Sequence, residues 1–352
     1  MRPINYINTY EKLLTPEIVS YLTQIHYYKG LQTLLVNQNQ EALAELLEIA
    51  KIQSTEASNR IEGIVTSDER LKKILSKKTT PRNREECEIS GYRDVLSTIH
   101  ENFDFIPIKP NMILQLYRDL YKFTDSNNLG SFKKTDNVIK EIYPDGTERI
   151  RFEPVSALET EYAMESICIA YQNAIKDKQK DPLLLISMFI LDFLCIHPFD
   201  DGNGRMSRLL TLLLLYRSNF IVGKYISIER LIADTKENYY SSLRESSISW
   251  HEGCNSYIPF VRYMLGVVIA AYKDFTERAN ILIIQDLSKP ERIKKIISEY
   301  VGKITKSKII EQCPDISSKT VERTLRELLD NQDIVKIGSG RYTCYKINED
   351  KQ

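Results

Sequence analysis

Residues 197–208 read His-Pro-Phe-Asp-Asp-Gly-Asn-Gly-Arg-Met-Ser-Arg. A base, two carboxylates, a glycine-flanked turn and two arginines thus lie close together in the chain. Apolar sequence precedes this stretch from Pro182 to Ile196 and follows it from Leu209 to Tyr216. The pattern predicts two buried helices joined by a short polar loop. The first N–H groups of a helix lack partners and its dipole favours an anion, so we expect this loop to bind phosphate.

The same stretch resembles the Fic family signature, HPFx[D/E]GNGRxxR, at every defined position. Family members mostly transfer AMP from ATP to a protein hydroxyl, a reaction called AMPylation. The resemblance covers about residues 30–275 and implies a mainly α-helical core with a β-hairpin flap. The chain has no GxxxxGK[ST] sequence, so a P-loop is not the rival explanation.

Two residues of the loop carry the chemistry that this resemblance implies. His197 suits a general base, because imidazole is half neutral near physiological pH and the attacking hydroxyl must lose a proton. Asp201 is expected to bind Mg²⁺, with phosphate oxygens and water as the other ligands. Asp200 stands at the variable position of the signature. The structural alternative for His197 is a buried histidine without a catalytic role.

The rest of the loop is expected to hold ATP, the implied substrate. Glycines allow backbone donors to approach phosphate oxygens, and paired guanidinium groups can fix the β- and γ-phosphates. The expected phosphate-binding residues are Gly202, Asn203, Gly204, Arg205 and Arg208. The alternatives are a turn without a ligand and surface salt bridges of the arginines.

An upstream segment, Ser58-Asn59-Arg60-Ile61-Glu62-Gly63, resembles the family's inhibitory motif, [S/T]xxxE[G/N]. Ser58 and Glu62 lie four residues apart and share a helical face, and Gly63 can end the helix. The resemblance implies an inhibitory helix over about residues 54–63 whose Glu62 pairs with Arg208 in place of the γ-phosphate. An ordinary helix end with an exposed glutamate is the alternative.

Two further segments resemble parts of the family's substrate sites. Residues 137–152, with the turn Pro144-Asp145-Gly146, predict a β-hairpin that would be the flap and would align a target protein by an open strand edge. Its lead-in Gly130-Ser131-Phe132-Lys133 has Phe and Lys where the family has Tyr and Arg. Asn238 and Tyr240 would contact adenine or ribose, although aromatic residues at helical spacing are more often core.

Helical spacing of apolar residues dominates the remaining sequence. Helices are expected at Pro16–Tyr28, Glu41–Ile52, Ser67–Leu75, Arg84–Ser97, Lys109–Tyr121 and Val155–Lys176. We divide the chain into an N-terminal helical region (1–110), a Fic core (111–280) and a C-terminal domain (289–348).

The C-terminal domain has the pattern of a winged helix-turn-helix. Helices are expected at Glu291–Tyr300, Lys306–Cys313 and Ser317–Leu329, followed by strands at Ile334–Ile337 and Tyr342–Ile347. A winged helix suggests DNA binding, which needs a basic footprint, but the charges of the last helix cancel. Protein recognition or dimerisation is therefore an equal alternative.

Composition limits the partners and the compartment. Lys+Arg and Asp+Glu are equal at 48 each among 352 residues, so no global charge attracts nucleic acid or membrane. Six scattered cysteines without CxxC spacing fit a reducing compartment. No signal-peptide pattern or membrane-length apolar run is present, so we expect a cytoplasmic protein without membrane contact.

Several functions remain open at this stage. The leading expectation is Mg²⁺- and ATP-dependent AMPylation of a target protein, including the enzyme itself as a homodimer. Removal of AMP, with Glu62 positioning water, and use of another nucleotide are alternatives within enzymes. A DNA-binding regulator whose core senses nucleotide without turnover is an alternative of another class.

Overall fold

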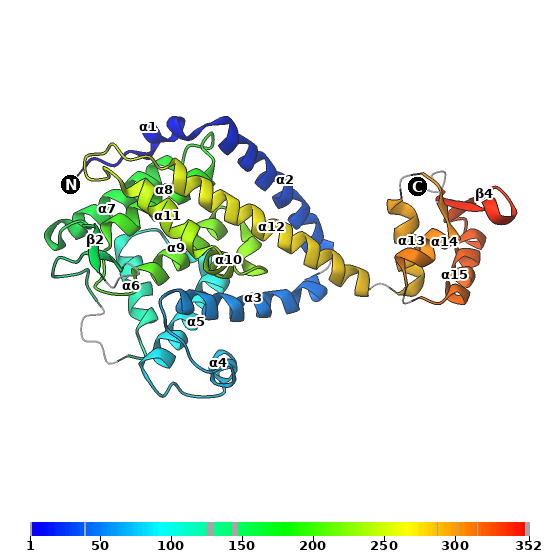
Figure 1. Cartoon of the computed structure of the whole chain (residues 1–352), viewed down its shortest axis with the longest axis horizontal. Helices are drawn as coiled ribbons and strands as arrows, with labels where there is room; N and C mark the ends of the chain where they lie inside the picture. Colours follow the sequence, from blue (N-terminus) through cyan, green and yellow to red (C-terminus); the bar gives the residue numbers. More distant parts are fainter. Residues whose placement is uncertain are drawn as a thin grey trace. The chain divides into compact units, whose positions relative to one another are not determined.

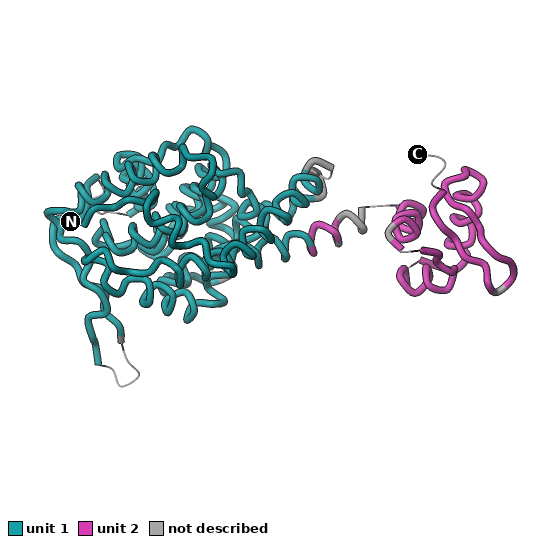
Figure 2. Tube along the Cα trace, turned by 90° about the horizontal axis from the view of Figure 1, so that it is seen from above, with its two compact units in different colours: residues 1–276 teal, residues 277–352 magenta. Residues whose placement is uncertain are grey.

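The structure is a computed structural model that describes residues 2–38, 40–124, 130–142, 147–286, 288–300, 302–314 and 316–348. The chain forms two compact units, residues 1–276 and 277–352, shown in teal and magenta in Figure 2. The described residues are mainly helical, as the sequence predicts (Figure 1). No helix among them is long and apolar enough to cross a membrane.

Unit 1 is built from helices with one β-hairpin. The helices are α1 (Tyr6–Tyr10), α2 (Pro16–Gln38), α3 (Gln40–Ile61), α4 (Asp68–Leu75), α5 (Arg84–Asn102), α6 (Pro110–Leu120), α7 (Ala157–Ala174), α8 (Pro182–Ile196), α9 (Asn203–Arg217), α10 (Ile228–Asp234), α11 (Lys236–Ser247) and α12 (Ile258–Asp286), the last of which continues into unit 2. Every helix expected from the sequence is present. Helix α2 continues well beyond its expected end, to Gln38, and α3 joins the expected helix at Glu41–Ile52 with the expected inhibitory helix and ends at Ile61.

The core of unit 1 is the pair α8 and α9. Leu, Ile and Phe side chains cover all sides of α8, which packs against α7 and α9 and is buried along nearly its whole length. Asp181 caps its start by accepting from the N–H of Leu183 at 2.9 Å, and Pro182 occupies the first turn. Residues 197–202 join the two helices, so the predicted phosphate loop is anchored by buried helices on both sides.

The hairpin consists of β1 (Ile139–Ile142) and β2 (Glu148–Phe152), paired antiparallel with Lys140 opposite Ile150. This confirms the predicted hairpin, although its turn at 144–146 lies outside the described residues. Neither strand pairs with a further strand among the described residues. At the base of β2, the Phe152 ring stacks on His251 with centroids 5.4 Å apart, which ties the hairpin to the loop after α11.

A charged side chain lies in the middle of the α8 core. Asp192 is fully buried and accepts hydrogen bonds from Trp250 Nε1 (2.7 Å), Tyr6 Oη (2.9 Å) and Tyr257 Oη (2.9 Å). Arg2 forms an ion pair with it at 3.1 Å. The residue that interrupts the apolar run thus joins segments that are far apart in the sequence.

The described residues of unit 2 contain the end of α12, three further α-helices and a three-stranded antiparallel sheet in the order β3-β5-β4. The elements are α13 (Lys289–Glu299), β3 (Ile304–Thr305), α14 (Lys306–Gln312), α15 (Ser318–Asp330), β4 (Ile334–Ile337) and β5 (Cys344–Ile347). An apolar cluster that includes Ile293, Ile309 and Leu325 forms its own core. The two-residue strand β3 was not expected from the sequence.

Candidate active site

A cavity of about 400 Å³ opens beside the loop between α8 and α9. Its lining comes from the ends of α3 and α8, the first turns of α9, the hairpin and α11. The polar lining residues are Glu62, Lys140, Glu141, Arg151, His197, Arg208, Tyr239, Tyr240, Arg244 and Ser247. The candidate base, one candidate phosphate-binding arginine and the candidate inhibitory glutamate therefore face the same space.

His197 ends α8 in the left-handed conformation, with φ 52° and ψ 61°. This backbone is unusual for a residue other than glycine and costs about 1–3 kcal/mol. Its Nδ1 lies 3.3 Å from the Leu194 carbonyl oxygen, which can only accept, so Nδ1 carries the proton and Nε2 is left as an acceptor. Burial lowers the pKa of His197 to about 4, which keeps the imidazole neutral near pH 7. The ring is thus in the form that a general base requires.

Asn203 braces the loop with its side chain. Its Oδ1 accepts from the Phe199 N–H at 3.0 Å and its Nδ2 donates to the Phe199 carbonyl at 2.7 Å. The Phe199 ring stacks on Tyr117 with centroids 3.7 Å apart, so Phe199 is an apolar anchor of the loop. The amide of Asn203 is therefore engaged within the protein here, whereas the sequence led us to expect a phosphate contact.

Gly202 has φ 78°, a conformation that favours glycine, and opens α9 without a side-chain cap from any described residue. The first N–H groups of this largely buried helix are thus available to an anion.

Arg208 faces the cavity and holds the end of α3. Its Nη2 lies 2.8 Å from Glu62 Oε1 and 2.9 Å from the Ser58 carbonyl oxygen, and its Nε donates to Ser58 Oγ at 2.7 Å. The Arg208 side chain is 3% exposed and that of Glu62 is 32% exposed. A methyl group on Gly204 would overlap Glu62 Oε1, so the glycine makes room for this carboxylate. Gly63 ends the segment with φ 78°, as its position in the sequence suggests.

Arg205 lies in a different environment from Arg208. Its Nη1 forms an ion pair with Glu88 of α5 at 2.6 Å, and its Nη2 donates to Tyr121 Oη at 2.6 Å. The side chain is 1% exposed. We expected the two arginines to face one phosphate chain, but in this structure the carboxylate on α5 draws Arg205 away from the lining of the cavity.

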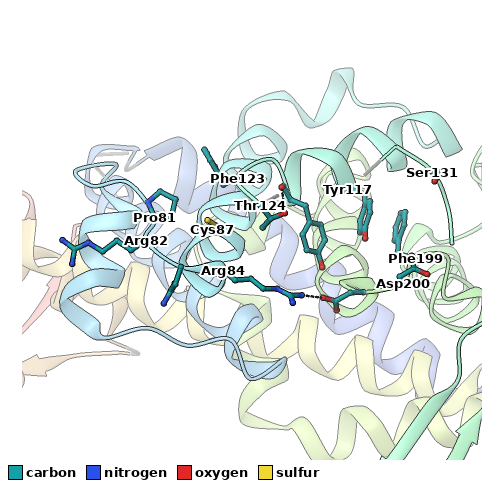
Figure 3. Close-up of a pocket in the computed structure, with 13 residues that line it drawn as sticks. Pro81, Arg82, Arg84, Cys87, Tyr117, Phe123, Thr124, Ser131, Phe199 and Asp200 are labelled. Atoms are coloured by element: carbon teal, nitrogen blue, oxygen red, sulfur yellow. Dashed lines mark hydrogen bonds and ion pairs between the residues drawn. The ribbon is translucent and has the colours of Figure 1, made fainter. Parts of the chain in front are cut away.

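A second cavity of about 640 Å³ lies between the loop, α5 and α6 (Figure 3). Asp201 is one of the residues that line it. Tyr117 and Phe199 stand at one side of this cavity, and Arg84 reaches toward the loop from the other. Arg84 lies 3.4 Å from Asp201, whose side chain is 59% exposed.

The surroundings of Asp201 bear on the expected metal. The described residues contain no group of three or more His, Cys, Asp or Glu side chains arranged to hold a metal ion. A single exposed carboxylate fits Mg²⁺ that takes its other ligands from phosphate oxygens and water, which is its common mode at nucleotide sites.

The α11 wall of the cavity differs in part from the expectation. Tyr240 lines the cavity, and so does Tyr239, which we had not singled out. Asn238 is exposed and is not among the described lining residues. Arg151 of β2 lies 5.9 Å from the centre of the Tyr240 ring. Arg151 was not singled out in the sequence. Because side chains alternate along a strand, Arg151 faces the side opposite to Ile150, and this alternation is the signal that could have identified it.

Comparison with known proteins places this geometry in a family. Residues 107–215 match the model of the Fic/DOC family. A Fic family protein from Desulfovibrio desulfuricans G20 has a similar fold, with a TM-score of 0.61 and 19% identity, covering 96% of this chain and 97% of that one. A Fic-1 fragment from Caenorhabditis elegans gives a TM-score of 0.55 at 21% identity, covering 75% and 72%. The helical core, hairpin and loop have the Fic fold, and the chain contains a Fic domain at residues 107–215.

Two curated relatives carry the name protein adenylyltransferase fic-1. The protein from Caenorhabditis elegans is 28% identical over 190 residues, which cover 51% of this chain and 32% of the relative. The protein from Caenorhabditis briggsae is 27% identical over 156 residues, which cover 43% and 25%. The chain therefore spans a third or less of the length of these relatives.

Proposed function

We propose that this protein transfers AMP from ATP to a Tyr, Ser or Thr hydroxyl of a target protein. The observation that carries the proposal is one cavity that contains a neutral imidazole, the start of a buried helix and a buried arginine. The names of the relatives support the same reaction. His197 Nε2 would take the proton of the hydroxyl as it attacks the α-phosphorus, and the bond to the pyrophosphate leaving group would break.

Charge on the triphosphate would be held by fixed groups of the protein. The first turn of α9, from Gly202 to Gly204, would receive phosphate oxygens, and Arg208 would contact the γ-phosphate. Asp201 would hold Mg²⁺, which offsets the negative charge of the phosphates. Arg205 would act at the β-phosphate only after leaving Glu88, so in the geometry described here it supports the loop.

We also propose that the protein inhibits itself. The Glu62 carboxylate pairs with the Arg208 guanidinium, which the γ-phosphate would need. It also lies where a phosphate oxygen would approach Gly204. Breaking a partly buried ion pair is costly, so ATP would bind only in an unproductive position while Glu62 is in place.

The target would dock on the hairpin. Its strands have edges that no described strand pairs with, and such edges bind an extended peptide by main-chain hydrogen bonds without selecting its side chains. The protein itself, as a homodimer, is one target that this mode allows. The C-terminal unit would be a winged helix that recognises protein or DNA.

The test is the Glu62→Gly variant with labelled ATP. Removal of the carboxylate frees Arg208, and we expect strong label incorporation into protein compared with the wild type. Arg60→Gly is the matched control, because Arg60 lies two residues before Glu62, is exposed and forms its ion pair with Glu56 and not with Arg208. Equal labelling of Glu62→Gly and wild type would reject the inhibitory role.

Two further experiments test His197 as the base and distinguish AMP transfer from AMP removal. His197→Ala in the Glu62→Gly background should abolish labelling while ATP still binds; transfer by this double variant would remove His197 from its role. Loss of label from AMPylated protein with the wild type, but not with Glu62→Gly, would instead favour the reverse reaction.

A further inference from the structure

Lys133 contacts the loop that carries His197 from the segment before the hairpin. The side chain of Lys133 is buried, and its Nζ lies 3.2 Å from the carbonyl oxygen of Ile196 and 2.7 Å from Oδ1 of Asn137. The backbone N–H of Lys133 donates to the carbonyl of Pro198 at 2.8 Å. One residue thus holds the chain on both sides of His197.

Asn137 completes this set of contacts. Its Nδ2 lies 3.4 Å from the carbonyl oxygen of His197 and 3.1 Å from that of Phe199. The four consecutive carbonyls of residues 196–199 therefore all accept from Lys133 or Asn137. We call these two residues the carbonyl brace.

The brace meets a need that the fold creates. The last carbonyls of a helix have no partners within it, and the end of the helix favours a cation, which Lys133 supplies to α8. Immediately after this point His197 takes its left-handed conformation, which persists only where surrounding contacts fix it. Lys133 is faced by two carboxylates, Asp136 in its own segment and Asp200 in the loop, and burial lowers its pKa to about 8.

We propose that Lys133 and Asn137 are positioning residues of the transfer reaction, which hold the backbone of residues 196–199 so that His197 points into the cavity. The inference rests on the proposed function, because it takes His197 as the base. Neither side chain is among the described residues that line the cavity, so both act through the loop.

The first experiment measures label transfer in the Glu62→Gly background. Lys133→Met should lower kcat by about 10²-fold, the loss typical of a misplaced catalytic group. KM for ATP should stay unchanged, because Arg208 and the first turn of α9 lie outside the brace. Lys133→Arg keeps a cation with several donors and should restore most of the rate. Lys134→Met is the control, since Lys134 is exposed and adjacent, and it should behave as the parent does.

The second experiment does not depend on activity. Hydrogen exchange of the His197 and Phe199 amides should be faster in Lys133→Met than in Lys134→Met, while exchange in α12 stays equal. Asn137→Ala, which removes two of the four carbonyl contacts, serves as a second variant if Lys133→Met unfolds, and it should show the same change to a smaller extent.

The outcomes separate the two ideas. An active parent whose kcat is unchanged by Lys133→Met and Asn137→Ala would overturn the positioning role. If kcat fell only because the melting temperature fell, and Lys133→Arg did not restore kcat, the positioning role would also be overturned. A parent without any label transfer would defeat the proposed function, while faster exchange of the loop would still support the brace.

Discussion

Arg208 is the residue at which, in the function that we propose, nucleotide binding and inhibition would compete. Its guanidinium has three partner atoms at the end of α3, two in Ser58 and one in Glu62, the residue after the helix. The Ser58 contacts orient the guanidinium, whereas Glu62 supplies the charge that a phosphate would otherwise supply. In the proposed function the same guanidinium would bind either the Glu62 carboxylate or a phosphate, while Ser58 holds it in place.

The pH dependence of transfer is a test of His197 at this scale. Burial lowers the pKa of His197 to about 4, so protonation removes the base only below about pH 5 and not near 6.5. In Glu62→Gly protein we expect single-turnover rates to remain flat with respect to this group from pH 5.5 to 8, and to fall on further acidification. A fall in the transfer rate that is centred near pH 6.5 and is caused by protonation of His197 would contradict the burial described here.

The direction of a side chain could be predicted only where the sequence motifs contain both that residue and the residue it contacts. The contact of Glu62 with Arg208 was implied by the resemblance of both segments to family motifs, whereas the contacts of Ser58 with Arg208 were not predicted. The orientation of Arg205 depends on Glu88, which no pattern in the sequence connects with the loop. The hydrogen bonds between Asn203 and Phe199 were missed for a related reason. The same residue types occur in turns whose side chains bond to their own backbone and in turns that bind phosphate.

Among elements, the crossing of α5 and α6 depends on one glycine. A methyl group at Gly91 would overlap the carbonyl oxygen of Leu120, which is backbone and cannot turn aside. Gly91→Ala should lower the free energy of unfolding by about 2–3 kcal/mol, measured by urea denaturation.

Gly30 in α2 is the matched control for this substitution. A methyl group there meets no described atom within 4 Å, so Gly30→Ala should raise the free energy of unfolding by about 0.5–1 kcal/mol. Equal effects of the two substitutions would show that the close approach of α5 and α6 is not present in solution.

At the scale of elements the sequence was a good guide where periodicity is strong. The bounds of α8 agree with the prediction, because Asp181 and Pro182 mark its start and the apolar run ends at the loop. The expected helix at Glu41–Ile52 and the expected inhibitory helix at about residues 54–63 form one continuous helix, α3, whose buried face near its end is made of Ser54, Ala57 and Ser58. Strand β3 is two residues long and has no pattern to detect.

Across the whole molecule, the buried carboxylate of Asp192 joins parts that lie up to 190 residues apart. Its partners could not be read from the sequence, because no local pattern relates Arg2 to α8. Arg2→Ala would leave this carboxylate without its countercharge, and we expect a loss of about 3 kcal/mol in the free energy of unfolding. Trp250, the only tryptophan, donates to Asp192 and reports the change by its fluorescence.

Arg60→Ala is the control for that measurement. The pair of Arg60 with Glu56 is exposed, with side chains 51% and 43% accessible, so its loss should cost less than about 1 kcal/mol. A similar small effect of Arg2→Ala, with unchanged Trp250 emission, would mean that the Asp192 cluster is not formed in solution.

The division into two units makes a prediction about how the chain unfolds. Each unit has its own apolar core, and the cluster around Ile293 and Leu325 draws only on residues after the boundary. Calorimetry of the full chain should therefore show two transitions, since units with separate cores unfold independently. A chain that ends at Asp286 should lose one transition, keep the other at the same temperature, and retain label transfer in the Glu62→Gly background. If truncation instead abolished the remaining transition, the core of unit 1 would depend on unit 2, and its helices could not by themselves hold His197 and Arg208 in place.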